Sequence, residues 1–128
     1  MQLKFRRLLA LLIDFILIFS IVYLPSSLIS SLALNTIVNI IIGFIVIIVF
    51  YQLFIHKDTI FQNTSIGKKM LRIYILNENN DKIIDKKILI KRNETTFKVF
   101  PIYIFQILIN NKSLGDYKYN TRVDLIKK

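Results

Sequence analysis

The sequence predicts an all-α membrane protein with two transmembrane helices, a short third hydrophobic segment and a small cytoplasmic β-hairpin. Three observations lead to this prediction. Hydrophobic residues make up 54% of the 128 residues. Residues 8–55 contain a single charged side chain, Asp14. The formal net charge of +10 therefore arises from the flanking regions. This length is sufficient for one domain.

The first predicted span covers residues 8–24 and ends at Pro25. Its length is near the lower limit of the roughly 17–25 residues that a helix needs to cross a bilayer. A secretory signal peptide is the alternative, because basic residues precede the apolar run. We reject it because the run contains Asp14, lacks a clear small-x-small cleavage site and leads into a further apolar segment.

The second predicted span covers residues 36–55, after an uncharged, serine-rich connection at residues 25–35. Basic residues precede the first span and follow the second, whereas the connection contains none. Because cytoplasmic loops carry the excess of lysine and arginine, both outer ends are predicted to be cytoplasmic. We expect a multi-pass protein of the bacterial cytoplasmic membrane with its N-terminus in the cytoplasm.

A polar cytoplasmic segment is predicted at residues 56–96. Within it, residues 68–76 alternate like a β-strand, residues 77–81 are typical of a turn, and residues 82–84 are a candidate return strand. Asp85 is typical of a helix N-cap for the basic stretch "KKILIKRNETT" that follows it. The segment therefore predicts a short hairpin followed by a basic helix at the membrane surface.

The third hydrophobic segment, residues 97–110, is short and contains Pro101. A full crossing would place the basic residues of the tail, residues 111–128, outside the cell, against the charge rule. A re-entrant or interfacial segment would keep this tail cytoplasmic. We favour the second alternative.

Composition also excludes several kinds of site. The chain has no cysteine and one histidine, so a disulfide, a thiolate site and a multi-histidine metal centre are all excluded. The glycine and lysine pair in "NTSIGKK" lacks the first glycine of a phosphate-binding loop. Basic residues on a soluble scaffold, as nucleic-acid binding requires, are not evident. We predict no enzyme activity, no catalytic residues, no metal and no cofactor.

Asp14 is the one charged residue within the first predicted span. It shares a helix face with Arg7, two turns and roughly 10 Å away, which is too far for direct contact without snorkelling or water. One interpretation is that Asp14 pairs with a cation from the cytoplasmic segment and pins the helix ends together. The other is that it binds a cation or exchanges a proton within a transport path.

Three stretches carry residues at characteristic spacings. The first is "RLLALLID", with Arg7 and Asp14. The second is "TSIGKKMLRIYIL", with Thr64, Gly67 and Lys68, followed by an arginine at Arg92. The third is "SLGDYKYNTRV", with Asp116, Thr121 and Val123. In their order and spacing these stretches resemble the RDD family of bacterial membrane proteins, named for one arginine and two aspartates. Two departures are Gly115, where the family usually has histidine, and a short interval between Arg92 and Asp116.

The resemblance covers nearly the whole chain and implies a single RDD-like membrane domain over residues 1–128. It places a candidate polar cluster at Arg7, Asp14 and Asp116, supported by Thr64, Gly67, Lys68, Arg92 and Thr121. It also implies a link to transport, since some members are associated with monovalent cation/proton exchange.

Two functions follow as expectations. The first is transport-associated cation or proton handling, as a homo-oligomer or with a larger membrane-protein partner, because two or three spans cannot enclose an aqueous path alone. The alternative is an accessory, immunity or assembly subunit of a larger membrane complex. The expected surroundings are the lipid bilayer and a protein partner, without nucleic acid.

Overall fold

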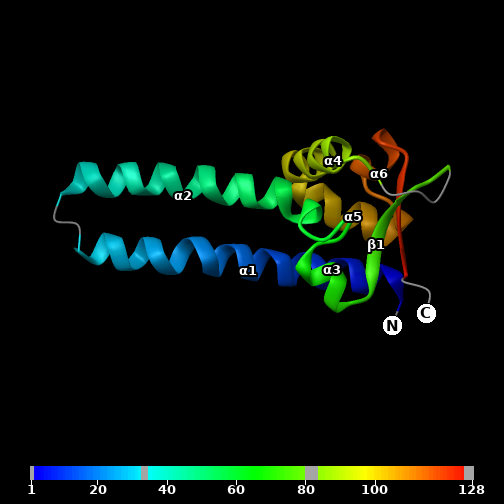
Figure 1. The fold of residues 1–128 in the computed structure, drawn as a ribbon, viewed down its shortest axis with the longest axis horizontal. Coiled ribbons are helices and arrows are strands. Elements are labelled where there is room, and N and C mark those ends of the chain that lie inside the picture. Colours follow the sequence, from blue (N-terminus) through cyan, green and yellow to red (C-terminus); the bar gives the residue numbers. More distant parts are fainter. Residues whose placement is uncertain (1, 33–34, 80–83, 126–128) are drawn as a thin grey trace.

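Two long helices stand on a smaller folded end. The computed structural model describes residues 2–32, 35–79 and 84–125. Helices α1 (Leu3–Leu32) and α2 (Thr36–His56) run side by side, and the other elements gather beside the start of α1 and the end of α2 (Figure 1). We call this end the base and define it as the described residues within 2–14 and 57–125.

Helix α1 is longer than predicted. It continues through Pro25 to Leu32, so the predictions that the span ends at Pro25 and that residues 25–35 form a connection are wrong. The serine hydroxyls do not interrupt the helix because they donate to its own carbonyl oxygens. Ser26 Oγ donates to Tyr23 O at 2.8 Å, and Ser27 Oγ donates to Leu24 O at 2.9 Å. The serine-rich stretch can therefore remain helical in apolar surroundings.

Both long helices are long and apolar enough to cross a membrane. At 1.5 Å per residue, α1 measures about 45 Å and α2 about 31 Å, against a hydrocarbon thickness of roughly 30 Å. Only 6% of the most apolar part of α2 is buried within the molecule. A helix in the core of a soluble protein would be mostly buried, so the outward apolar face of α2 requires another apolar environment.

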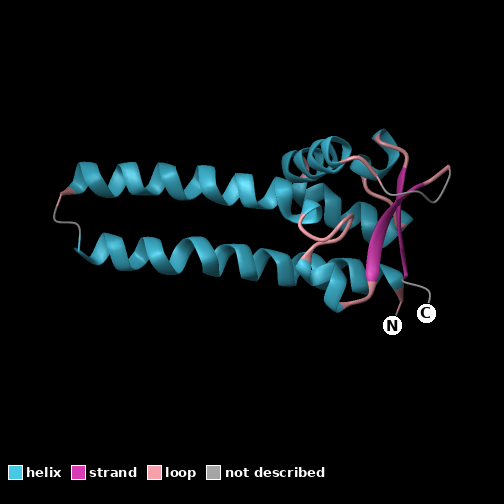
Figure 2. Cartoon of the chain, in the orientation of Figure 1, coloured by secondary structure: helices cyan, strands magenta, loops and turns pink. Residues whose placement is uncertain are grey.

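The base contains short elements in a mixed order. They are the 3₁₀-helix η1 (Lys57–Thr59), α3 (Ile66–Met70), β1 (Ile73–Asn77), α4 (Lys86–Lys98), α5 (Phe100–Asn110), α6 (Leu114–Lys118) and β2 (Thr121–Leu125). The two strands cross the far end of the base (Figure 2). They are antiparallel, with Ile73 opposite Leu125 and Asn77 opposite Thr121.

The pairing described for β1 differs from the predicted local hairpin. Strand β1 pairs with a strand from the end of the chain, and residues 66–70 within the second motif are helical. Of the predicted return strand at 82–84, residues 82 and 83 lie outside the described residues. Through Leu125, the predicted tail is an integral part of the base. Short-range alternation identified strand character but could not identify its distant partner.

The prediction of a helix after Asp85 is confirmed. The Asp85 side chain accepts a hydrogen bond from Lys87 N at 3.2 Å, and α4 then runs to Lys98. Helix α5 follows with Pro101 in its first turn, where a missing N–H costs no helix bond. Its 11 residues measure about 16 Å, roughly half the hydrocarbon thickness. A straight crossing by α5 is therefore excluded.

Two apolar cores hold the base to the long helices. The first joins α1 to the sheet and α4 through Ala10, Ile73, Ile75, Leu89 and Val123. The second joins α1, α2 and α5 through Leu11, Ile18, Phe54, Tyr103 and Ile107. The two cores contact adjacent faces of α1, through Ala10 and Leu11. Arg7 and Asp14 lie between these two faces on the helix.

Candidate functional site

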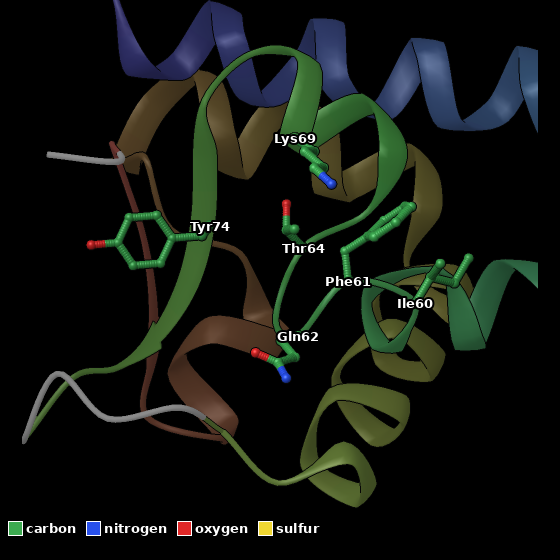
Figure 3. A pocket seen from close by; sticks show the side chains of 6 residues that line it. All are labelled: Ile60, Phe61, Gln62, Thr64, Lys69 and Tyr74. Carbon is green, nitrogen blue, oxygen red and sulfur yellow. The ribbon is translucent and has the colours of Figure 1, made fainter. Parts of the chain in front are cut away.

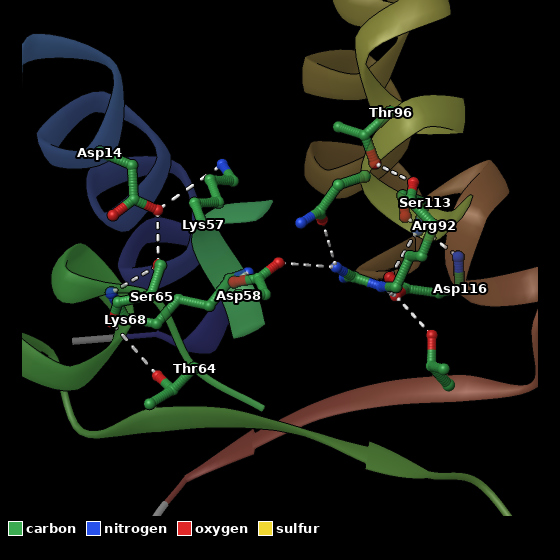
Figure 4. Close-up of polar contacts among 12 residues, drawn as sticks. Asp14, Lys57, Asp58, Thr64, Ser65, Lys68, Arg92, Thr96, Ser113 and Asp116 are labelled. Carbon is green, nitrogen blue, oxygen red and sulfur yellow. Dashed lines mark hydrogen bonds and ion pairs between the residues drawn. The ribbon is translucent and has the colours of Figure 1, made fainter. Parts of the chain in front are cut away.

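The base contains a buried network of charged side chains. Its members are Arg7, Asp14, Lys57, Asp58, Lys68, Arg92 and Asp116, and each is at most 6% exposed. We call these seven residues the charge network; six of them are labelled in Figure 4. Four are cations and three are carboxylates, so this buried set carries one positive charge in excess.

Asp14 lies at one end of the charge network. Its Oδ1 accepts a hydrogen bond from Gly67 N at 2.7 Å, and its Oδ2 accepts one from Ser65 Oγ at 2.5 Å. Lys57 Nζ lies 3.5 Å from the same Oδ2 (Figure 4). The structure thus pairs Asp14 with a cation that directly follows α2, as the first interpretation of this aspartate expects. The carboxylate links α1, η1 and α3.

Close packing of α3 against α1 makes these contacts possible. Ser65 caps α3, and its Oγ accepts a hydrogen bond from Lys68 N at 3.3 Å. A Cβ added to Gly67 would overlap the backbone oxygen of Ala10 and lie 2.9 Å from Asp14 Oδ1. Glycine is therefore required here by close approach, which brings its N–H within reach of the carboxylate.

Asp116 lies at the other end. Its Oδ2 accepts hydrogen bonds from Arg7 Nη2 at 2.5 Å and from Ser113 N at 3.0 Å. Its Oδ1 accepts from Arg92 Nε at 2.8 Å and from Thr121 Oγ1 at 3.1 Å. Ser113 and Asp116 also form the capping box of α6. This one carboxylate therefore joins α1, α4, α6 and β2.

The electrostatic balance around Asp116 favours its charged form. Burial alone would raise the pKa of its carboxyl, but the guanidinium groups of Arg92 and Arg7 outweigh burial and hold the pKa well below the ordinary value of 3.8. For Arg92, burial alone would lower the pKa, because it disfavours the charged form of the guanidinium. The carboxylates of Asp116 and Asp58 outweigh burial and raise this pKa above its usual value. This pair is therefore fully ionised at neutral pH.

Asp58 connects the two ends. Arg92 Nη1 lies 3.4 Å from Asp58 Oδ2, and the Lys68 ammonium donates to Asp58 Oδ1. Asn93 places this part of α4 against α2, because its Nδ2 donates to Ile55 O at 3.1 Å. Burial lowers the pKa of Lys68 to about 8 despite the attraction of Asp58. The Lys68 ammonium can therefore lose its proton near neutral pH.

The structure brings some of the predicted cluster together. Arg7 and Asp116 are in direct contact, whereas Asp14 lies at the opposite end of the charge network with its own partners. Gly67, Lys68, Arg92 and Thr121 all contact an aspartate of this network, and Thr64 Oγ1 donates to Ile73 O at 3.0 Å.

Sequence reasoning missed Lys57, Asp58, Ser65 and Ser113. A signal for the first two was present, because Lys57 and Asp58 are the first charged residues after the apolar stretch that ends at Ile55. Within the described residues, no cluster of three or more histidine, cysteine, aspartate or glutamate side chains is placed to hold a metal ion.

The pKa of Asp116 predicts acid sensitivity. Because the folded-state pKa lies below 3.8, the unfolded chain binds more protons as the pH falls through that value. The stability from this carboxylate is therefore present above pH 3.8 and lost progressively below it. Thermal unfolding in detergent from about pH 5 to about pH 2 should show a falling midpoint.

Asp116→Asn should make this pH dependence shallower. Asp124 gives a matched control: its carboxylate is partly exposed and lies 3.8 Å from Arg122 Nη2, so Asp124→Asn should change the unfolding midpoint little. An unchanged slope in Asp116→Asn would contradict the prediction.

Two candidate membrane spans above a base closed by buried ion pairs define a class of small, mostly helical membrane-type proteins. The model of the RDD family matches residues 3–119. The chain belongs to the RDD family. No curated protein and no solved structure matches it.

Proposed function

We propose that the chain is an accessory subunit of a larger assembly in the bacterial cytoplasmic membrane, with α1 and α2 crossing the bilayer and the base in the cytoplasm. Asp14 and Lys57, which pair at 3.5 Å, form one boundary of the hydrocarbon. From there, α1 extends about 28 Å to Leu32, and α2 extends about 31 Å. Both lengths match the roughly 30 Å of hydrocarbon. The cationic base supports a cytoplasmic orientation.

An apolar face that lies beyond this boundary carries the proposal. Helix α5 runs along α1 away from the hydrocarbon: the Phe100 ring lies 6.2 Å from that of Phe15, whereas Lys4 Nζ donates to Ile109 O at 3.1 Å. Ile102, Phe105 and Ile109 share one face of α5, and they are 56%, 65% and 71% exposed. In the proposed placement this face lies beyond the lipid tails, and exposed apolar patches of this kind mark protein contact sites.

The charge network supports a structural role for its carboxylates. Each of the three aspartates contacts at least one cation within the base. A carboxylate that binds a transported cation needs an accessible oxygen, whereas these side chains are at most 3% exposed.

Transport-associated cation or proton handling stays a second candidate. The pKa of about 8 at Lys68 favours proton handling, because this ammonium can release a proton near neutral pH and the charge network then carries no excess charge. Ion or proton flux into vesicles that contain only the purified chain would support this candidate over an accessory role.

Site-specific photo-crosslinking in native membranes tests the accessory role. We expect benzoylphenylalanine at position 105 to give adducts with a protein, visible as a larger species on a denaturing gel. The matched control is position 44, because Phe44 is equally exposed but lies in the middle of α2, facing lipid. Protein adducts at 105 and their absence at 44 support the proposal. Absence of protein adducts at 105 overturns it.

A further inference from the structure

Three basic side chains of the base have no acidic partner among the described residues. Arg6, Lys69 and Arg72 come from α1, α3 and the turn into β1. Within the described part of the chain, no carboxylate lies within ion-pair distance of any of the three. Arg6 Nη1 donates to Leu71 O at 3.2 Å, which holds its guanidinium beside the turn. We call these three residues the α3 cations.

Two hollows open beside the α3 cations. The larger, about 600 Å³, is lined by Ile60, Phe61, Gln62, Thr64, Lys69 and Tyr74 (Figure 3). The Lys69 ammonium lies 4.2 Å from the centre of the Phe61 ring, so both reach the same hollow. The smaller, about 300 Å³, is lined by Arg6, Met70, Leu71 and Arg72. Each hollow therefore combines a cation with apolar side chains.

Exposed apolar residues surround these cations. Ile60 and Phe61 follow η1, and Ile66 and Met70 flank the lysines of α3; all four are exposed, Met70 to 66%. Cations interspersed with exposed aliphatic and aromatic side chains are typical of a surface that meets both phosphates and acyl chains.

This surface starts at the depth of the lipid headgroups, beside Asp14, and ends near Arg6, about 12 Å farther along α1. Helix α3 is held to α1 at Asp14, through Gly67 N, and nearer the N-terminus through Arg6 and Leu71. In the proposed placement, Asp14 marks the hydrocarbon boundary. The headgroup layer extends several ångströms beyond that boundary, because the full bilayer exceeds its roughly 30 Å core by about 5–7 Å on each side. The long side chains of Lys69 and Arg72 can extend toward this layer.

We propose that the α3 cations and their two hollows form a binding site for the phosphate headgroup of an anionic phospholipid. The inference rests on the proposed membrane placement and adds to it a specific lipid class. Lys69 and Arg72 bind the phosphate, and Arg6 adds positive charge from α1. Phe61 and Ile66 contact the glycerol and the upper acyl chains, whereas Met70 lies beside Arg6, farther from the hydrocarbon. Lipid at this site braces α3, which is also the helix that contacts Asp14.

Titration of fluorescent phosphatidylglycerol into the purified full-length chain in neutral detergent tests this site. At low salt, we expect the wild type to bind phosphatidylglycerol more tightly than phosphatidylcholine. The variant K69Q/R72Q should lose at least about tenfold in phosphatidylglycerol affinity, given the attraction of each basic side chain to anionic lipid. Both lipids binding equally to the wild type would overturn the proposal.

The matched control is K86Q/K87Q, which removes the same charge from the first turn of α4. These lysines are exposed and lie at the opposite end of α4 from Phe97, whose ring lies 5.2 Å from that of Tyr51 on α2. The control should bind phosphatidylglycerol like the wild type. An equal loss in both variants would show attraction to net charge alone and overturn the site. Circular dichroism checks that both variants are folded.

Inorganic phosphate, as a competitor, distinguishes a lipid from a free anion. If it displaces the lipid at equal concentration, the ligand is the free anion and the lipid proposal fails. Failure of the lipid site is distinguishable from failure of the accessory role. Crosslinking from position 105 in the K69Q/R72Q background reports the protein contact without dependence on the headgroup.

Discussion

Arg92→Leu is expected to lower the free energy of unfolding by about 3–5 kcal/mol, the usual cost of breaking a buried ion pair on one side. Arg92 is 1% exposed and contacts both Asp58 and Asp116. Leucine fills about the same volume as the arginine side chain. It leaves the carboxylates of Asp58 and Asp116 each with one cation fewer in a low-dielectric interior. Urea unfolding in detergent, followed by circular dichroism, measures the difference.

Lys98→Leu is the matched control on the same helix. Lys98 pairs with Glu94 one turn away at 2.7 Å, and both side chains are exposed on the surface of the molecule. Exposed pairs of this kind contribute little, so we expect no measurable change in unfolding. Equal stability of Arg92→Leu and the wild type would show that the charge network does not hold the base together.

Gly67→Ala is the second change with a large expected effect. The added methyl would overlap Ala10 O in the backbone of α1, which has little freedom to move, so α3 must shift outward. Such overpacking typically costs about 1–3 kcal/mol. The shift also lengthens the 2.7 Å hydrogen bond from Gly67 N to Asp14. We expect a lower urea midpoint and faster hydrogen exchange at the amides of residues 66–70.

Gly43→Ala provides the comparison. Gly43 lies in α2, and a Cβ there would meet no atom within 4 Å. Alanine favours a helix over glycine by roughly 1 kcal/mol, so this variant should be as stable as the wild type or slightly more so. Similar losses in the two variants would mean that the effect of Gly67→Ala is not steric.

Features set by neighbouring residues were predictable from the sequence. The apolar stretch between Asp14 and Lys57 predicted two helices, because hydropathy depends on composition along the chain. Asp85 predicted the start of α4, because an N-cap bonds only to the next residues of its own helix. The stretch at Pro25 was misread because proline is usually a helix boundary, whereas the helix continues beyond it.

The partners of the charged residues depended on tertiary structure. Arg7 and Asp116 are 109 positions apart, so their contact depended on the folding that brings α1 and α6 together in the base. Strand β1 likewise pairs with β2, which is remote in the sequence, because Ile73, Ile75 and Val123 are buried in the same apolar core. The sequence by itself determined which long segments lack charged residues, because hydropathy depends only on composition along the chain. Only the folded base decided which cation neutralises each carboxylate, because ion pairing depends on distances between segments remote in the chain.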